Sequence, residues 1–222
     1  MDDQDEIAHV AERSQELHAA LQDVLEGADG YSTFDGSLRA DASAAAGELS
    51  LEHASALRIL MTTGHPSSAT ALLRLQYEAV VRSAWLLFAA TDAEVSLIQS
   101  ELDEEAERKA SSLPMVGVML KALEANGPDG LHNDLTQVKA VLGKGMNSFI
   151  HAGIHALDRT QSGFPVRLAK QVIASSNGIS TMAAMLLANL TGEVERGRAI
   201  NRLVPSFADV LPSLHRRNGV GA

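Results

Sequence analysis

The sequence contains no cysteine, and this absence excludes several kinds of site. A chain without cysteine has no disulfide framework, no thiolate ligand for a metal ion and no cysteine nucleophile. Aromatic residues are also scarce, at 4% of the chain, whereas apolar residues as a whole make up 45%. The core must therefore be built mainly from alanine, leucine, valine, isoleucine and methionine, a composition typical of helical bundles.

Long apolar segments are missing as well. No stretch reaches the length of about 18 uncharged apolar residues that suggests a membrane-spanning helix. The longest approach, within residues 66–90, is interrupted by Arg74, Glu78 and Arg82. The N-terminal residues, MDDQDE, are acidic and lack the apolar run of a secretory signal. From these absences we expect a cytoplasmic protein that makes no membrane contact.

Basic residues are also few relative to acidic ones. The chain has 18 lysines and arginines against 28 acidic residues, so its formal net charge is −10 at pH 7. This balance argues against broad DNA binding and against any extended nucleic-acid footprint. The C-terminal part still leaves room for a local basic surface, because it carries Arg196, Arg198, Arg202, Arg216 and Arg217.

Apolar residues recur at helical spacing along the chain, and no segment shows the sustained alternation of a strand. We predict an all-α fold, a helical bundle of about seven or eight helices, in a single domain of residues 1–222. Residues 1–30 are predicted to form an acidic N-terminal helix, and 192–222 a C-terminal helical segment with a frayed tail. Two long helices, at 66–90 and 166–190, are apolar on nearly all sides and are expected at the centre.

The helix predicted at 66–90 carries Arg74, Glu78 and Arg82 at intervals of four residues, which places them on one face. Charges on a buried helix must be paired or must face a cleft, because burying them alone is costly. Two interpretations follow. Either Glu78 neutralises both arginines in a structural triad, or it holds them ready to bind a small anion. Trp85, one turn further on, could then stack on a planar ligand or fill the core.

A second polar face is predicted on residues 146–159, which read MNSFIHAGIHALDR and are expected to form one continuous helix. Asn147, His151 and His155 fall together on this face, opposite an apolar one. Histidines at positions i and i+4 can bind the same metal ion, so a metal site is one alternative and a polar surface face is the other.

Gly153 is the residue that could bring the histidine face close to the charged line of Arg74, Glu78 and Arg82. A glycine inside a helix costs about 1 kcal/mol relative to alanine and is usually retained for close packing. If Gly153 packs against the helix at 66–90, the histidine face lies near the charged line. In the metal alternative, the ligands would then be His151, His155 and Glu78.

Two segments resemble known proteins. Residues 71–87, ALLRLQYEAVVRSAWLL, and 146–153, MNSFIHAG, resemble an uncharacterised bacterial all-helical family and, more broadly, the HEPN superfamily of helical bundles. HEPN proteins often dimerise, and many are metal-independent ribonucleases in toxin–antitoxin or phage-defence systems. Their motif is an arginine, often followed by a polar residue, with a histidine five positions after the arginine. Asn147 and His151 match this motif, whereas Met146 stands at the arginine position.

The resemblance implies a homodimer that contacts RNA, with His151 and Asn147 as the catalytic residues and no cofactor. The motif arginine supports the charge on the cleaved phosphate, and methionine cannot do so. Either Arg74 or Arg82 supplies that charge from another helix, or the protein has no nuclease activity. We favour the second alternative, in which the protein dimerises or binds a small anion without catalysing a reaction.

Overall fold

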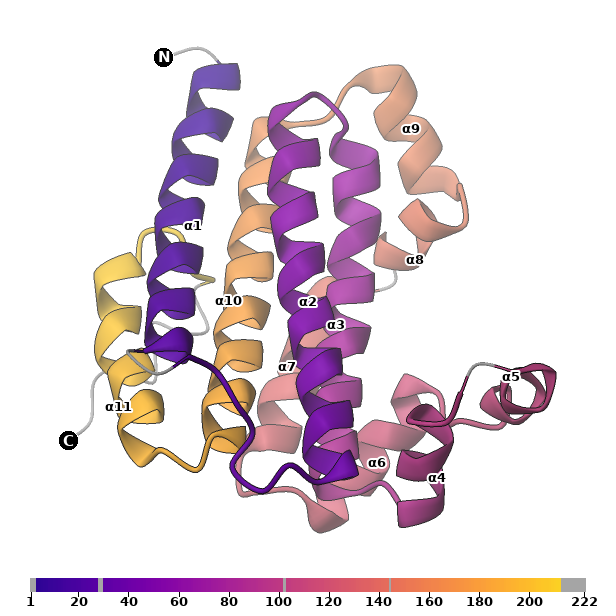
Figure 1. The fold of residues 1–222 in the computed structure, drawn as a ribbon. Coiled ribbons are helices and arrows are strands. Elements are labelled where there is room, and N and C mark those ends of the chain that lie inside the picture. Colours follow the sequence, from indigo (N-terminus) through magenta and orange to yellow (C-terminus); the bar gives the residue numbers. More distant parts are fainter. Residues whose placement is uncertain (1–2, 28–29, 102, 144, 213–222) are drawn as a thin grey trace.

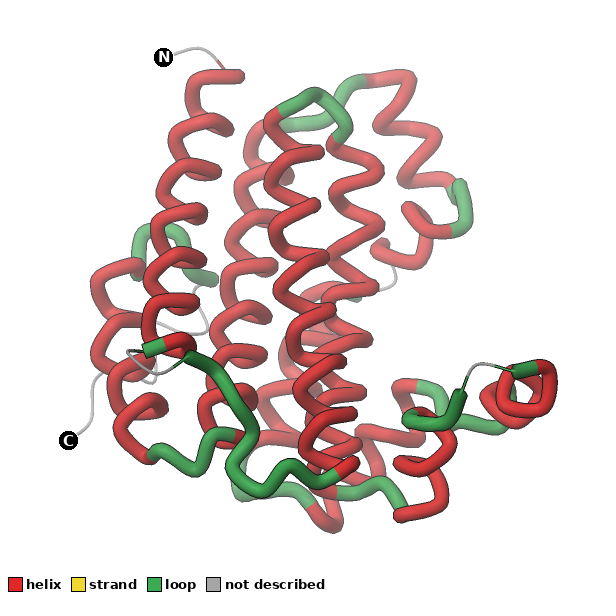
Figure 2. The backbone as a smooth tube through the Cα atoms, viewed as in Figure 1, coloured by secondary structure: helices red, strands yellow, loops and turns green. Residues whose placement is uncertain are grey.

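The computed structural model describes residues 3–27, 30–101, 103–143 and 145–212 of the chain. Within these ranges the protein is all-α, with eleven α-helices, one short 3-10 helix and no strand (Figure 1; Figure 2). The predicted fold class is confirmed, whereas the predicted number of about seven or eight helices is wrong. The tail that was predicted to be frayed, with Arg216 and Arg217, lies outside the described residues.

Four helices are much longer than the others: α1 (Asp3–Glu26), α2 (Leu38–Thr62), α3 (Pro66–Phe88) and α10 (Val166–Leu190). The shorter elements are α4 (Asp92–Ile98), α5 (Glu104–Ala110), α6 (Val116–Asn126), α7 (Leu131–Leu142), α8 (Gly145–Ile150), α9 (Ile154–Ser162), α11 (Val194–Leu203) and the 3-10 helix η1 (Val204–Phe207).

The long helices lie side by side and form the body of the molecule (Figure 1). The consecutive helices α2 and α3 make a closely packed hairpin. Helix α10 packs against α1, α2, α3 and α11, and α3 also contacts α6, α8 and α9. The two helices that were predicted to be central, α3 and α10, therefore do lie at the centre of the packing.

Small side chains on α2 allow this close approach. A Cβ atom added at Gly47 would lie only 2.9 Å from Cδ2 of Leu187 on α10. On the side facing α3, Ser43 Oγ donates to the Ser83 carbonyl at 2.9 Å, and Ser83 Oγ donates to the Ser43 carbonyl at 2.8 Å. These reciprocal hydrogen bonds satisfy two buried hydroxyl groups where larger side chains would not fit.

Helix α3 begins at Pro66, as the sequence predicts, because the first turn of a helix leaves its N–H groups without intrahelical partners. It has 23 residues, and three charged side chains interrupt its apolar surface. Neither α3 nor any other helix in the described ranges is both long enough and apolar enough to cross a membrane.

Candidate functional site

The charged line on α3 lies at the edge of the core rather than inside it. Arg74 Nε donates to Glu78 Oε1 at 2.6 Å, and the two side chains are 33% and 35% exposed. Arg82 is also only partly buried, but it has no hydrogen bond or ion pair with any described residue. The charged line on α3 thus consists of one ion pair and one arginine without a partner among the described residues, in place of the triad that one interpretation proposed.

The surroundings of Arg82 disfavour its charge. Burial lowers the pKa of Arg82 below its ordinary value, and the nearby Glu78 carboxylate opposes part of that shift. Glu78 Oε1 accepts from Arg74, and no described residue accepts a hydrogen bond from the Arg82 guanidinium. A partly desolvated guanidinium of this kind can bind a carboxylate or a phosphate.

Other polar residues on α3 have structural roles. Trp85 is 2% exposed and fills the core, so it cannot stack on a ligand as one interpretation proposed. Tyr77 is buried, and its hydroxyl donates to the Leu135 carbonyl of α7 at 2.9 Å. Gln76 is fully buried and joins α3 to α10 through hydrogen bonds to Ser176 and Ser180.

The segment 146–159 is not one helix, which corrects the prediction. Helix α8 ends at Ile150 and α9 begins at Ile154, and Ala152 between them has a positive φ of 48°. Ser148 stabilises the break, because its Oγ accepts a hydrogen bond from the His155 N–H at 2.8 Å and its carbonyl accepts from the Gly153 N–H at 2.7 Å. Local bonds of this type compete with continued helix.

This break separates the predicted histidine pair. His151 lies in the turn after α8, and His155 lies in the first turn of α9, so they are not one turn apart on a common helix. A Cβ atom added at Gly153 would lie 2.7 Å from Ser148 Oγ, so this glycine packs closely against α8. No group of three His, Asp or Glu side chains in the described ranges is placed to hold a metal ion, and the set of Glu78, His151 and His155 is therefore not assembled as one.

Helix α8 packs on α3. Met146, at the position of the motif arginine, is 8% exposed and belongs to the core. Asn147, His151 and His155 are exposed to solvent. The motif positions that match HEPN proteins are thus accessible, whereas the position that differs is buried.

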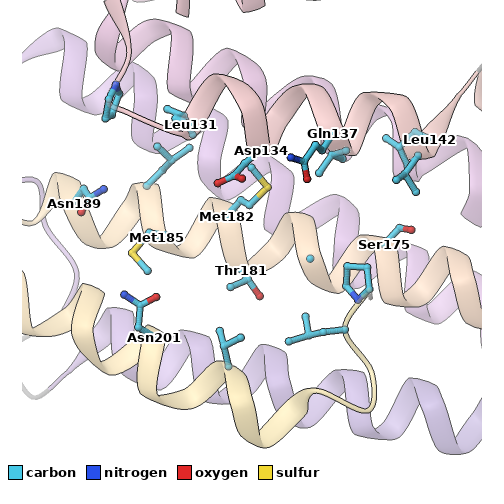
Figure 3. A pocket seen from close by; sticks show the side chains of 18 of the residues that line it. Leu131, Asp134, Gln137, Leu142, Ser175, Thr181, Met182, Met185, Asn189 and Asn201 are labelled. Atoms are coloured by element: carbon cyan, nitrogen blue, oxygen red, sulfur yellow. The ribbon is translucent and has the colours of Figure 1, made fainter. Parts of the chain in front are cut away.

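The structure also contains a groove beside α10 that the sequence did not indicate. Helix α7, helix α10 and the segment from Asn201 to Pro212 enclose about 810 Å³ (Figure 3). Most of the wall is apolar, with Leu131 and Leu142 on α7 facing Met182 and Met185 on α10.

A few polar side chains also face the groove. They come from all three walls: Asp134, Gln137, Ser175, Thr181, Asn189 and Asn201 (Figure 3). Two of the lining residues, Asp129 and Asp134, are acidic, and the lining described here contains no lysine, arginine or histidine. The charged side chains in this described part of the lining are therefore acidic, and both are exposed to solvent.

The comparisons with known proteins give one match. The model of a family of unknown function, DUF6988, matches residues 47–213. The matched segment includes the charged line on α3, helices α8 and α9 and every residue that lines the groove, while α1 lies before it. No curated protein and no solved structure matches the chain. Because the family model covers most of its length, the chain belongs to DUF6988, a family of unknown function.

Proposed function

We propose that this protein is a non-enzymatic binding protein that holds a largely apolar organic ligand in the groove between α7, α10 and the Asn201–Pro212 segment. One observation carries the proposal, namely the size and lining of the groove. Its volume of about 810 Å³ falls within the range of about 300–1,000 Å³ that is usual for small-molecule sites. Apolar walls with a few polar side chains are the usual composition of such sites.

The two methionines suit a groove that adapts to its ligand. Met182 and Met185 are half-buried, and they face the groove from α10. A methionine side chain has three rotatable bonds and a polarisable sulfur, so it can adjust to irregular apolar surfaces. Asn189 and Asn201 offer amide groups that can fix the orientation of a ligand by hydrogen bonding (Figure 3).

We expect the neutral, apolar dye Nile red to bind to the protein saturably, with an increase in fluorescence. Met182→Trp should weaken this binding by about tenfold or more, because the indole would occupy space inside the groove. The measurement is a fluorescence titration, and circular dichroism establishes that the variant is folded. Met115→Trp is the matched control, since Met115 is 81% exposed and lies outside the groove. Absence of saturable binding, or an equal loss in the control variant, would refute the proposed function.

A second candidate is the RNA-directed function of a dimeric, HEPN-like protein. The observation in its favour is the unpaired Arg82 on α3, the helix against which α8 packs. Asn147 and His151 are exposed on the α8 side, as contact with an RNA chain would require. The second candidate would need Arg82 to supply the phosphate contact that Met146 cannot supply.

Because Met146 is buried and uncharged, we expect the purified protein not to cleave single-stranded RNA, with or without EDTA, in a gel assay over a range of concentrations. The second candidate predicts the opposite result: cleavage that resists EDTA and falls about a hundredfold or more in His151→Ala. Arg82→Ala should then abolish it as well, whereas Arg108→Ala, on the exposed helix α5, should leave it unchanged. Light scattering on the same samples would test for the dimer that this candidate requires.

A further inference from the structure

We infer that the ligand of the groove is an amphipathic organic cation, with its positive charge at Asp134 and its apolar part along α10. This inference rests on the proposed function and makes it more specific. It names the chemical class of the ligand, which the volume and apolar character of the groove leave open.

The charged residues of the lining favour a cationic ligand. The charged residues in the described part of the lining are Asp129 and Asp134, and this part contains no cationic side chain. An anionic ligand would be held against two carboxylates with no cation to receive it. Both acids are exposed to solvent, so a cationic ligand would gain from both carboxylates most strongly at low ionic strength, where this attraction is least screened.

Asp134 is the better placed of the two acids. Its carboxylate points from α7 toward α10, and Met182 lines the groove from α10 (Figure 3). It makes no hydrogen bond or ion pair with any described side chain, so its oxygens are free to accept from a ligand. Gln137 lies one turn further along α7 and also faces the groove, where its amide oxygen can accept a second hydrogen bond (Figure 3). A protonated amine has several N–H donors and can use both acceptors at once.

The apolar part of the ligand can then lie along the wall that α10 provides. From Asp134 the wall continues along α10 through Met182 and Met185 (Figure 3). An alkyl chain or a flat ring system laid along these methionines would bury apolar surface at about 25 cal/mol per Å². The ammonium group of the ligand would determine which ligands are selected, while the apolar part of the ligand would supply most of the binding free energy.

Asp134 also lies in the first turn of α7, where a carboxylate interacts favourably with the helix dipole. This structural role would affect the stability of the protein but would not discriminate between ligands. The test of the inference must therefore measure which ligand is preferred, and not only whether the variant is stable.

The experiment compares three ligands that share the same alkyl chain: octylammonium, octanol and octanoate. Each would be titrated at low ionic strength as a competitor of Nile red. We expect octylammonium to compete about tenfold better than octanol, and octanoate to be the weakest. Asp134→Asn should reduce the advantage of octylammonium over octanol to about twofold or less, while octanol binds as before. The control variant Glu124→Gln removes one exposed acid of α6 outside the groove and should leave the preference intact.

The outcomes separate the inference from the proposed function. If octanol and octylammonium compete equally well, or if octanoate competes best, the ligand is not a cation and the inference fails, although the groove still binds apolar molecules. If the preference for the cation persists in Asp134→Asn, the charge is not recognised at this residue, which also overturns the inference. If none of the three ligands competes and Nile red itself does not bind, both the inference and the proposed function are wrong.

Discussion

Replacing Gln76 with leucine is expected to lower the free energy of unfolding by about 2 to 4 kcal/mol. Gln76 is fully buried between α3 and α10, and both ends of its amide are bonded. Its Nε2 donates to the Ser176 carbonyl at 2.9 Å and to Ser180 Oγ at 3.2 Å, while its Oε1 accepts from Ser176 Oγ at 2.7 Å. Leucine would leave these groups of α10 buried without their partner, and urea denaturation measures the cost.

A double-mutant cycle tests whether the cost comes from the hydrogen bonds. Removing one partner leaves a buried group unsatisfied, whereas removing both can be nearly neutral. We therefore expect the double variant Gln76→Leu with Ser176→Ala to be less destabilised than the sum of the two single variants. Gln22→Leu, at an exposed site on α1, is the control and should change stability by less than about 0.5 kcal/mol. Strict additivity of the two changes would show that Gln76 acts through its packing alone.

This network shows how far the sequence predicts the fold. Apolar periodicity located α3 and α10 correctly, because both helices bury most of their circumference. The same pattern did not distinguish Gln76 from the charged residues near it. Periodicity shows where polar residues lie on a helix, but it does not show which residues of another helix they contact. The meeting of Gln76 with Ser176, 100 positions away, depends on tertiary packing.

The break after α8 was missed for a local reason. Ala152 takes a positive φ of 48°, which alanine rarely adopts, and alanine is the best helix former. The adjacent Gly153 was the one available signal, and it was interpreted as a packing residue inside a helix. Its actual position is the N-cap of α9, where its backbone is extended and bonds to Ser148.

The groove could not be predicted from the sequence. Its walls come from α7, α10 and the segment after Asn201, and α8 and α9 separate α7 from the other two in the chain. Each wall is amphipathic, and an apolar stripe at helical spacing predicts burial in the core. Only the arrangement of the three elements leaves Met182 and Met185 lining a groove, although the Met185 sulfur also lies against Gly197 of α11.

A buried histidine of α1 lies near a buried arginine of α2, and neither has an acidic partner among the described residues. His18 is 6% exposed and Arg58 is 4% exposed. Arg58 Nε donates to Gln15 Oε1 at 3.2 Å, but its two other guanidinium nitrogens and His18 Nδ1 find no partner among the described residues. Burial lowers the pKa of Arg58 to about 10. Burial, with a smaller contribution from the charge of Arg58, lowers the pKa of His18 from 6.5 to about 4.

The lowered pKa of His18 should make the protein sensitive to mild acid. Below pH 6.5 the unfolded chain binds a proton at this histidine, whereas the folded protein does not do so until about pH 4. The stabilising contribution is therefore complete above pH 6.5 and is lost progressively as the pH falls toward 4. Between about pH 7.5 and about pH 5 we expect a loss of about 1 to 2 kcal/mol in the free energy of unfolding.

His18→Leu isolates this contribution, because leucine fills a buried position on α1 without titrating. The free energy of unfolding of the variant, measured by urea denaturation at several pH values, should fall less than that of the wild type over the same interval. His9→Leu replaces an exposed histidine of the same helix and should retain the wild-type pH dependence. If His18→Leu and the wild type lose stability in parallel, His18 is accessible to protons in the folded protein, and the contact of α1 with Arg58 opens without global unfolding.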